Sequence, residues 1–357
     1  MHCRRSSRPA RQGGAALVLA MLIFALCAAL IVAMKSDFER LYQRGGNIFV
    51  TEQSRAYLRG AEGLATLALL ADWDVDQQQG EAAKDTLEDI WAREEVPYPL
   101  DEGGWLSGRL EDLQGRFNLN HLADKAEEGE GKPPYTAAQA QFVRLLLAVT
   151  DERLGESEAM AIARSIGDWL DADSQPRFDG AEDDYYAGLT PAYRASNQPM
   201  LSVTELRAVK GMSPELYQAL EPWVTVWPLQ PGPLNIHTAP AMVLRSLGPD
   251  DSLRPLGEAD ALSLVAQRCD SGFADIGEFL NHPALADSKD RMTASQALLD
   301  EQTGYFLLRA RVEVAGRNQR LYSVLERKNR RVSVLSRATD GRMFLPETGR
   351  VETCETL

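Results

Sequence analysis

The sequence has a shortage of positive charge, and this argues against one class of function. Its 357 residues include 38 lysines and arginines but 52 aspartates and glutamates, a formal net charge of −14. Nucleic-acid binding needs a basic face, so we do not expect a polyanion partner. An acidic surface instead favours solubility and the binding of cations.

Cysteines and histidines are also few, with four of each. No two cysteines form a C-x-x-C pair, which argues against a zinc site or a thioredoxin-type motif. If the C-terminal bulk is periplasmic, Cys269 and Cys354 can form one disulfide. Two unpaired thiols are the alternative, because the sequence gives no Cα–Cα distance.

One long apolar run is present, and it lies near the N-terminus. Four arginines and Gln12-Gly13-Gly14 precede it, and residues 15–34 carry no charge. This length allows a helix to cross a hydrocarbon core of about 30 Å. The positive-inside rule keeps the arginines in the cytoplasm and places the rest of the chain outside.

Four kinds of N-terminal segment are candidates to explain this apolar run. A cleaved signal peptide has a shorter apolar region, of roughly 7–15 residues, and a clearer cleavage site. A lipoprotein signal has a small residue before its cysteine, whereas Leu26 precedes Cys27. A plain anchor leaves the Arg-Gln-Gly-Gly sequence unexplained. The junction of Gly14 and Ala15 resembles a type IV pilin-like leader, cut after Gly14 by prepilin peptidase, and we adopt this interpretation.

The fifth residue of that mature chain is Leu19, where most pilin-like proteins have glutamate. In those proteins the glutamate pairs with the N-terminal amine of the neighbouring subunit. A carboxylate in lipid is costly without such a partner. A subunit without the glutamate needs no neighbour above it, which fits a place at the tip of a fibre. Alternatively, Leu19 is one more apolar residue of a membrane span.

The pattern after Met34 predicts an α+β fold. Apolar residues three and four apart, from Phe38 to Leu70, indicate an amphipathic helix that continues the span and is weakened or bent at Gly45-Gly46. Residues 105–120 are typical of two strands and a turn. Alternation in residues 305–338 predicts further strands of one antiparallel sheet, with a turn at residues 316–319.

The stretch between these strands is mostly helical. The candidate helices are Thr136–Asp151, Ser157–Asp171, Val203–Val209, Pro214–Leu220, Ala239–Leu247, Glu258–Arg268 and Ile276–Leu280. The simplest topology is a helix-plus-sheet domain interrupted by a large inserted helical domain. The predicted parts are a leader (1–14), a transmembrane helix (15–34), a first pilin-like part (35–120), the insertion (121–303) and a final sheet with a C-terminal tail (304–357).

Carboxylates are crowded in the segment from Asp168 to Asp184, and Arg177 is the one lysine or arginine within that segment. Crowded carboxylates raise each other's pKa, and a hard cation relieves the repulsion. Ca²⁺ takes 6–8 oxygen ligands in flexible loops. The fixed spacing of an EF-hand is missing. We predict a calcium site with Asp171, Asp173, Glu182 and Asp183 as ligands, and with Asp179, Asp184 and Asn197 as further candidates.

Two alternatives to the calcium site stay open. One is a solvated acidic loop without a ligand. The other is an acid–base pair of a membrane-anchored hydrolase, although no histidine or nucleophile adjoins the carboxylates in sequence. We therefore expect no enzyme and no catalytic residues.

Residues 202–220 resemble a helix-hairpin-helix, a unit that often binds the DNA backbone. A short helix from Thr204 ends at Gly211, and Ser213-Pro214 begins a second helix. The hairpin has little positive charge, so phosphate binding is weak and a structural role is favoured. A membrane-anchored periplasmic DNA-binding protein and a plain membrane-anchored calcium-binding protein remain the competing functions.

Several segments together resemble the minor pseudopilin K family of type II secretion systems. They are Gly14-AALVLAM, GRLEDLQGRFNLN (108–120), DWLDAD and GAEDDYY (within 168–186), PAYRASNQPM (191–200), SVTELRAVKGMSPELY (202–217) and PLNIHTAP (233–240). The resemblance implies a pilin-like α+β domain with a helical insertion, anchored in the bacterial inner membrane with its C-terminal domain in the periplasm.

The resemblance also implies a mechanical role. Members join minor pseudopilins I and J, and other pseudopilus subunits, in a complex at the tip of the pseudopilus. That complex primes assembly of the fibre whose growth exports folded proteins across the outer membrane. The family is expected to bind calcium in the acidic loop, and Gly14 and Ala15 then mark processing by prepilin peptidase.

Overall fold

The computed structural model describes residues 14–79, 83–93, 96–101, 103–126, 129, 133–339 and 354. The chain divides into two compact units, Met1–Ala56 and Tyr57–Leu357. The leader predicted for residues 1–14 lies outside the described residues except for Gly14.

The described part of the first unit is helical and belongs to helix α1, Ala15–Gln79. Its apolar side chains are exposed from Leu17 to Met34. By length and composition, this helix suffices to cross a membrane. The helix runs through Gly45 and Gly46 without a break, so the predicted weak point does not interrupt it. Each glycine costs a helix only about 1 kcal/mol, which so long a hydrogen-bonded run tolerates.

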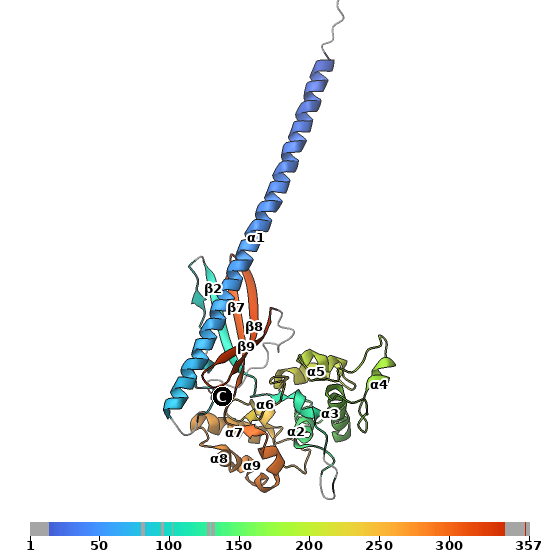
Figure 1. Cartoon of the computed structure of the whole chain (residues 1–357), viewed down its shortest axis with the longest axis vertical. Coiled ribbons are helices and arrows are strands. Elements are labelled where there is room, and N and C mark those ends of the chain that lie inside the picture. The colour runs from blue at the N-terminus through green and yellow to red at the C-terminus, as the bar shows by residue number, and fades with distance from the viewer. Residues whose placement is uncertain are drawn as a thin grey trace, which may run out of the picture. The chain divides into compact units, whose positions relative to one another are not determined.

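The second unit contains a five-stranded antiparallel sheet in the order β1-β2-β7-β8-β9 (Figure 1). Its strands are β1 (Tyr98–Pro99), β2 (Gly104–Asp112), β7 (Tyr305–Val314), β8 (Arg317–Arg327) and β9 (Val332–Ala338). Strand β2 pairs with β7 from Gly104↔Val314 to Asp112↔Phe306. The prediction that segments far apart in sequence form one antiparallel sheet is therefore confirmed.

Two details of the predicted strands were wrong. The turn between β7 and β8 lies at Ala315-Gly316, not at residues 316–319, because Val314 already pairs with Arg317. Both turn residues have positive φ, +52° and +72°, as a two-residue hairpin turn that matches the strand twist requires. The second strand of residues 105–120, β3 (Phe117–Asn118), leaves the main sheet and pairs in parallel with β4 (Val224–Thr225).

The C-terminal part of α1 has a buried stripe at helical spacing. Leu58, Ala61, Ala65 and Leu69 recur every three or four residues and are at most 7% exposed. Polar contacts to the sheet run along the same stretch of helix. Glu62, for example, accepts hydrogen bonds from the Ser323 hydroxyl and the Arg337 guanidinium. The helix expected after the apolar run is confirmed, but it buries an apolar face only in this C-terminal part, because Phe38, Phe49 and Leu64 of the predicted face are exposed.

The regular elements between β2 and β7 are mainly helices, as predicted, although turns and loops make up much of this stretch. Its longer helices are α2 (Ala137–Val149), α3 (Glu156–Leu170), α5 (Pro214–Leu220) and α7 (Glu258–Asp270). Single turns and short strands join them: η2 (Leu119–Ala123), α4 (Asp183–Ala187), η3 (Val203–Ala208), η4 (Glu221–Trp223), β5 (Leu234–Asn235), α6 (Ala241–Leu244), α8 (Ile276–Leu280), α9 (Pro283–Ala286), η5 (Lys289–Arg291), α10 (Thr293–Gln296) and β6 (Leu299–Asp300). A 3₁₀ turn, η1 (Ile90–Ala92), precedes β1.

Two of the predicted helices differ from expectation. The helix expected over 203–209 is the 3₁₀ helix η3, which ends at Ala208, and the helix expected over 239–247 contracts to the single turn α6. Pro240 lacks a backbone N–H and occupies the N-cap of α6, so the helix begins only after it.

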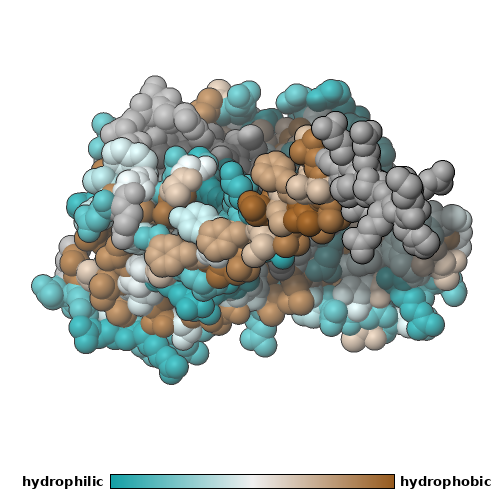
Figure 2. All heavy atoms as spheres, turned by 90° about the horizontal axis from the view of Figure 1, so that it is seen from above, coloured by the Kyte–Doolittle hydropathy of each residue, from teal (hydrophilic) through white to brown (hydrophobic). Residues whose placement is uncertain are grey.

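Two apolar clusters stabilise this region. One gathers α2 and α3 around Phe142, Ile166 and Trp169, and the other gathers α6, α7 and α8 around Leu264 and Phe279. On the face of the molecule that Figure 2 shows, hydrophobic side chains are also exposed among hydrophilic ones.

Candidate metal centre

The acidic loop connects α3 to α4, and its ends are fixed by those helices. Asp171 is the C-cap of α3, and Glu182 is the N-cap of α4. Asp171, Asp173 and Glu182 each place a carboxylate oxygen within 4.8 Å of the others, close enough to hold one ion. Three of the four preferred candidates therefore lie together.

The other candidates lie differently. Asp183 uses Oδ1 to accept a hydrogen bond from the Ala195 N–H at 2.9 Å. Asp179 and Asp184 are exposed, and Asp179 forms a turn with φ of +62°. None of these three belongs to the 4.8 Å group. Asn197 is held at the end of α3, where its N–H donates to the Trp169 carbonyl at 2.9 Å.

Several oxygens of the candidate ligands are buried without a hydrogen-bond partner. Among the described residues, these include Asp171 Oδ1, both carboxylate oxygens of Glu182 and Asn197 Oδ1. Glu182 is only 4% exposed. Buried polar atoms are nearly always paired, and an unpaired buried charge is costly. The loop thus presents acceptor oxygens with no donor, an arrangement that a hard cation satisfies.

The electrostatics of the loop agree with this arrangement. Burial, followed by the negative charges of Asp168 and Asp171, raises the pKa of Glu182 to about 7. Asp173 lies at the solvent-exposed edge, and a hydrogen bond from Lys125 lowers its pKa. Burial and the neighbouring negative charges therefore disfavour the ionised form of Glu182, a cost that a bound cation offsets.

Asp168 shapes the loop without belonging to the ligand group. Its buried carboxylate accepts hydrogen bonds from the backbone N–H groups of Arg177 and Ala181, the latter at 2.8 Å. The Arg177 side chain donates to the carbonyls of Leu122 and Ala123 at 2.8 and 2.6 Å. Arg177 also lies 3.1 Å from Asp171 Oδ2. The loop is therefore tied both to α3 and to the segment after β3.

Sequence reasoning missed Lys125 altogether. Its ammonium forms an ion pair with Asp173 Oδ2 and lies 3.5 Å from Asp171 Oδ2. Lys125 is 48 residues from Asp173 in the sequence, and no local pattern indicates the contact.

The hairpin of residues 202–220 also contacts the acidic loop. Lys210 donates from Nζ to the carbonyls of Asp179 and Gly180 at 3.2 and 2.9 Å. Gly211 has φ of +85°, and a Cβ there would lie 2.8 Å from Ile162 of α3. The hairpin turn is thus packed against α3 and the loop, which favours the structural role.

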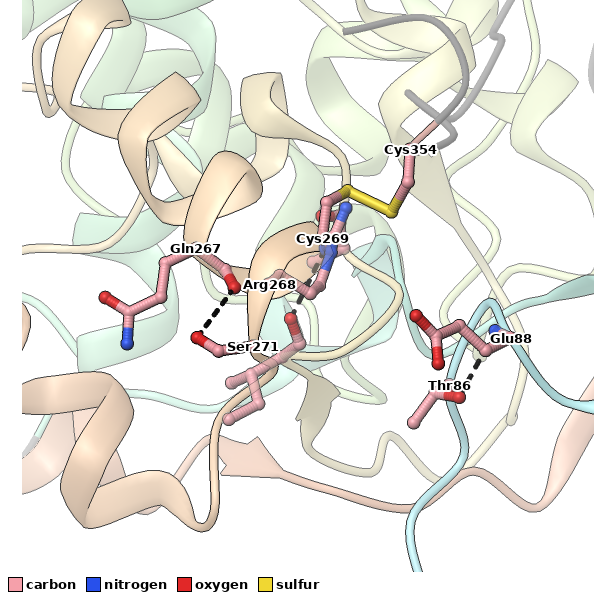
Figure 3. Close-up of a disulfide and its surroundings, with 9 residues drawn as sticks. Thr86, Glu88, Gln267, Arg268, Cys269, Ser271 and Cys354 are labelled. Atoms are coloured by element: carbon pink, nitrogen blue, oxygen red, sulfur yellow. Dashed lines mark hydrogen bonds between the residues drawn. A yellow bond between two sulfur atoms is a disulfide. The ribbon is translucent and has the colours of Figure 1, made fainter.

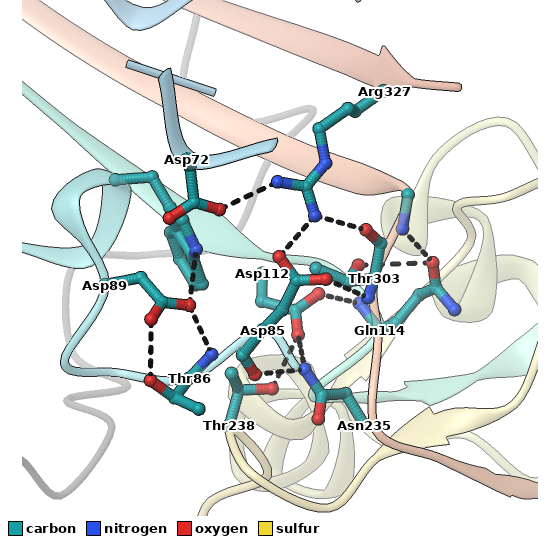
Figure 4. Close-up of polar contacts among 12 residues, drawn as sticks. Asp72, Asp85, Thr86, Asp89, Asp112, Gln114, Asn235, Thr238, Thr303 and Arg327 are labelled. Atoms are coloured by element: carbon teal, nitrogen blue, oxygen red, sulfur yellow. Dashed lines mark hydrogen bonds and ion pairs between the residues drawn. The ribbon is translucent and has the colours of Figure 1, made fainter. Parts of the chain in front are cut away.

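A second carboxylate cluster surrounds Arg327 at the end of β8 (Figure 4). Arg327 donates to Asp72 of α1 at 2.8 Å, to Asp85 and to the Thr303 carbonyl at 3.2 Å. Asp72, Asp76 and Asp85 also approach within 4.8 Å, but the guanidinium already pairs with two of them. This cluster is an ion-paired junction.

Asp112, at the end of β2, extends the junction. It accepts hydrogen bonds from the Thr238 hydroxyl at 2.5 Å and from the Asn235 amide at 3.0 Å, and Asn235 also donates to the Asp85 carbonyl (Figure 4). Burial raises the pKa of Asp112. The junction therefore connects α1 and the sheet with the segment that follows β4.

Cys269 and Cys354 form a disulfide, with Cα atoms 5.3 Å apart (Figure 3). This decides between the two possibilities that the sequence leaves open. Cys269 lies in the last turn of α7, so the bond fixes one point of the C-terminal tail to that helix.

A long N-terminal helix that is apolar at its start and then amphipathic against an antiparallel sheet defines a pilin-like subunit. In this subunit a helical region with an acidic loop separates two paired strands. The family described as "Type II secretion system (T2SS), protein K" matches residues 115–229 and 234–299.

Relatives and a solved structure agree with the family match. The type II secretion system protein K of Pseudomonas aeruginosa is 34% identical, with 95% of this chain and 96% of the relative covered. That of Aeromonas hydrophila is 32% identical, with 93% and 98% covered. A chain of the GspK-GspI-GspJ complex from enterotoxigenic Escherichia coli superposes with a TM-score of 0.69 at 28% identity, covering 83% of this chain and 99% of that one.

The chain belongs to the type II secretion system protein K family. It is a minor pseudopilin of type II secretion, which confirms the resemblance found in its motifs.

Proposed function

We propose that this minor pseudopilin is a single-pass inner-membrane protein, cut after Gly14, that joins minor pseudopilins I and J at the tip of the pseudopilus and starts its assembly. The observation that carries the anchor is the exposed apolar run of α1, which needs lipid or neighbouring helices to cover it. The existence of a complex of GspK, GspI and GspJ supports the choice of partners.

Leu19 supports the place at the tip. Its side chain is apolar and exposed on α1, where most pilin-like subunits carry the glutamate that pairs with a neighbour. The periplasmic placement of the second unit is supported by the Cys269–Cys354 disulfide, because such bonds persist in oxidising compartments.

Mass spectrometry of the N-terminus tests this proposal. The chain is purified from cells with and without prepilin peptidase. A mature chain that starts at N-methylated Ala15 only when the peptidase is present is the expected result. Retention of the arginine-rich leader, or loss of the whole apolar run, contradicts the proposal. Co-purification with pseudopilins I and J then tests the partners.

We further propose that the acidic loop binds Ca²⁺ through Asp171, Asp173 and Glu182, with Asn197 as a neutral ligand. The buried, unpartnered oxygens of Asp171, Glu182 and Asn197 carry the proposal, and Asp173 joins them because its carboxylate lies within 4.8 Å of those of Asp171 and Glu182. Carboxylate and amide oxygens are the ligands that Ca²⁺ prefers. Bound there, the ion offsets carboxylate repulsion and holds the end of α3 against the start of α4.

Calorimetric titration of the full-length chain in detergent with Ca²⁺ tests the site. Glu182→Gln keeps the size of the side chain and removes its charge, and we expect it to weaken binding strongly. Asp151→Asn is a matched control, since Asp151 is exposed between α2 and α3 with φ of +49°, which asparagine tolerates. Equal affinity of wild type and Glu182→Gln contradicts the assignment of Glu182 as a ligand.

A further inference from the structure

Lys125 occupies the same carboxylates that the proposed calcium site uses. Its ammonium pairs with Asp173 Oδ2 and lies 3.5 Å from Asp171 Oδ2. Its side chain is about half exposed, at 48%, whereas that of Asp171 is 11% exposed. The lysine therefore reaches the ligand group from the solvent side.

The backbone just before Lys125 is held in place, so the lysine side chain extends toward the carboxylates from a fixed point. The Arg177 guanidinium donates to the carbonyls of Leu122 and Ala123, at the end of η2. Arg177 itself is bound to Asp168 and Asp171. A short, fixed segment thus presents the ammonium to the acidic loop, and the loop and the segment share one arginine.

One ammonium neutralises the group only in part. Of the three ligand carboxylates, Lys125 contacts those of Asp171 and Asp173, and Arg177 pairs with that of Asp171 alone, yet both oxygens of Glu182 and Oδ1 of Asp171 still have no hydrogen-bond partner among the described residues. A divalent ion that binds between Asp171, Asp173 and Glu182 must share or take the oxygens that Lys125 holds. It is also repelled by the ammonium at this short range.

We propose that Lys125 is a tethered cation that competes with Ca²⁺ for Asp171 and Asp173. This inference rests on the proposed calcium site and concerns its regulation. With the ion absent, the lysine stabilises the loop and keeps its shape. When the ion binds, the ammonium is displaced. Lys125 thereby lowers the affinity of the site for Ca²⁺.

Three substitutions in the full-length chain separate this role from a general charge effect. Lys125→Met removes the ammonium and keeps the apolar stem. Lys125→Arg keeps the charge. Lys328→Met removes one exposed lysine just after β8 and changes the net charge by the same amount. Each variant is titrated with CaCl₂ by calorimetry, and its melting temperature is measured with chelator and with saturating Ca²⁺.

We expect Lys125→Met to bind Ca²⁺ about three- to tenfold more tightly than wild type. Its calcium-free form should melt at a lower temperature, so the calcium-induced shift grows. Lys125→Arg and Lys328→Met should bind with an affinity near that of wild type.

The outcomes distinguish the two proposals. If wild type binds Ca²⁺ and Lys125→Met binds with equal or lower affinity, competition by Lys125 is wrong and the calcium site stands. If Lys328→Met tightens binding as much as Lys125→Met, net charge explains the effect and the local role is wrong. If neither wild type nor Lys125→Met binds Ca²⁺, the calcium site itself is wrong, and the competition with it.

Discussion

Arg327 at the end of β8 donates a hydrogen bond of 2.8 Å to Asp72 of α1, joining two residues that are 255 positions apart in the chain. Both side chains are buried, at 4% and 7% exposure, and Arg327 also pairs with the buried Asp85. The pair ties the helix to the sheet at the place where the helical region begins.

Removing this arginine should strongly destabilise the second unit. Arg327→Met leaves Asp72 and Asp85 buried without a cation, which typically costs about 3–5 kcal/mol. Chemical unfolding of the full-length chain in detergent measures the loss. Arg330→Met is the matched control, because the Arg330–Asp74 pair is mostly exposed and should contribute less than about 1 kcal/mol. Equal losses in the two variants would contradict the role of burial.

Asp72 should make stability depend on pH with a definite sign. Burial, and after it the charge of Asp89, raises the pKa of Asp72 to about 6, although Arg327 acts in the opposite direction. A carboxyl with a raised pKa in the folded state stabilises most at low pH, and the contribution is lost as pH rises through that pKa. The stability of wild type relative to Asp72→Asn should therefore fall by about 2 kcal/mol from about pH 4 to about pH 7.

Asp74→Asn provides a control with the opposite sign. A hydrogen bond from Arg330 lowers the pKa of Asp74, so its contribution is present at neutral pH and is lost as pH falls through the lowered pKa. Wild type should gain relative to Asp74→Asn as pH rises over the acidic range. Unfolding curves of wild type, Asp72→Asn and Asp74→Asn across the acidic pH range check both signs. If the stability of wild type relative to Asp72→Asn rose with pH, the raised pKa of Asp72 would be wrong.

The disulfide should contribute measurably to stability. Cys269 and Cys354 enclose 85 positions of sequence, and breaking such a crosslink typically costs about 2–4 kcal/mol. We expect a reductant to lower the unfolding midpoint of wild type and to leave that of the double variant Cys269→Ser, Cys354→Ser unchanged. Cys27, an exposed thiol on α1, stays in both proteins and controls for other effects of the reductant. An unfolding midpoint of wild type that does not change with reductant would contradict a stabilising role of the disulfide.

Substitutions of Lys210 and of Lys125 should change the affinity for Ca²⁺ in opposite directions. Lys210 binds two loop carbonyls and lies over the Tyr185 ring, 5.2 Å from its centroid, so it fixes the loop without touching the ligand oxygens. Lys210→Met should loosen the loop and weaken Ca²⁺ binding about three- to tenfold, in line with the loss of one or two hydrogen bonds. Calorimetry on the two lysine variants side by side checks this. Tighter binding by Lys210→Met would show that its charge, and not its contacts, matters.

Much of the fold could be predicted from local pattern. The alternation from Phe306 to Val314 predicts a strand because β7 buries that face, and Ser213-Pro214 predicts the start of α5 because serine caps and proline begins helices. The turn at Ala315-Gly316 was misplaced by a residue or two, since alanine rarely adopts the positive φ that it has there.

The site could be predicted only where its residues are close in sequence. Asp171, Asp173 and Glu182 fall within one short loop, so their spacing is visible in the sequence. Lys125 and the Arg327 junction depend on pairs joined by the tertiary fold. No periodicity links residue 72 to residue 327, and the two side chains meet only in the folded arrangement of α1 and the sheet.

The register of β2 and β7 has a consequence for how members of this family can vary. Asp112 at the end of β2 pairs with Phe306 near the start of β7, so the chain leaves the sheet and returns to it at neighbouring positions. Insertions or deletions between Asp112 and Phe306 leave the pairing register of the two strands unchanged. The helical region between these strands can therefore be enlarged, trimmed or remodelled while α1 and the sheet keep their dimensions.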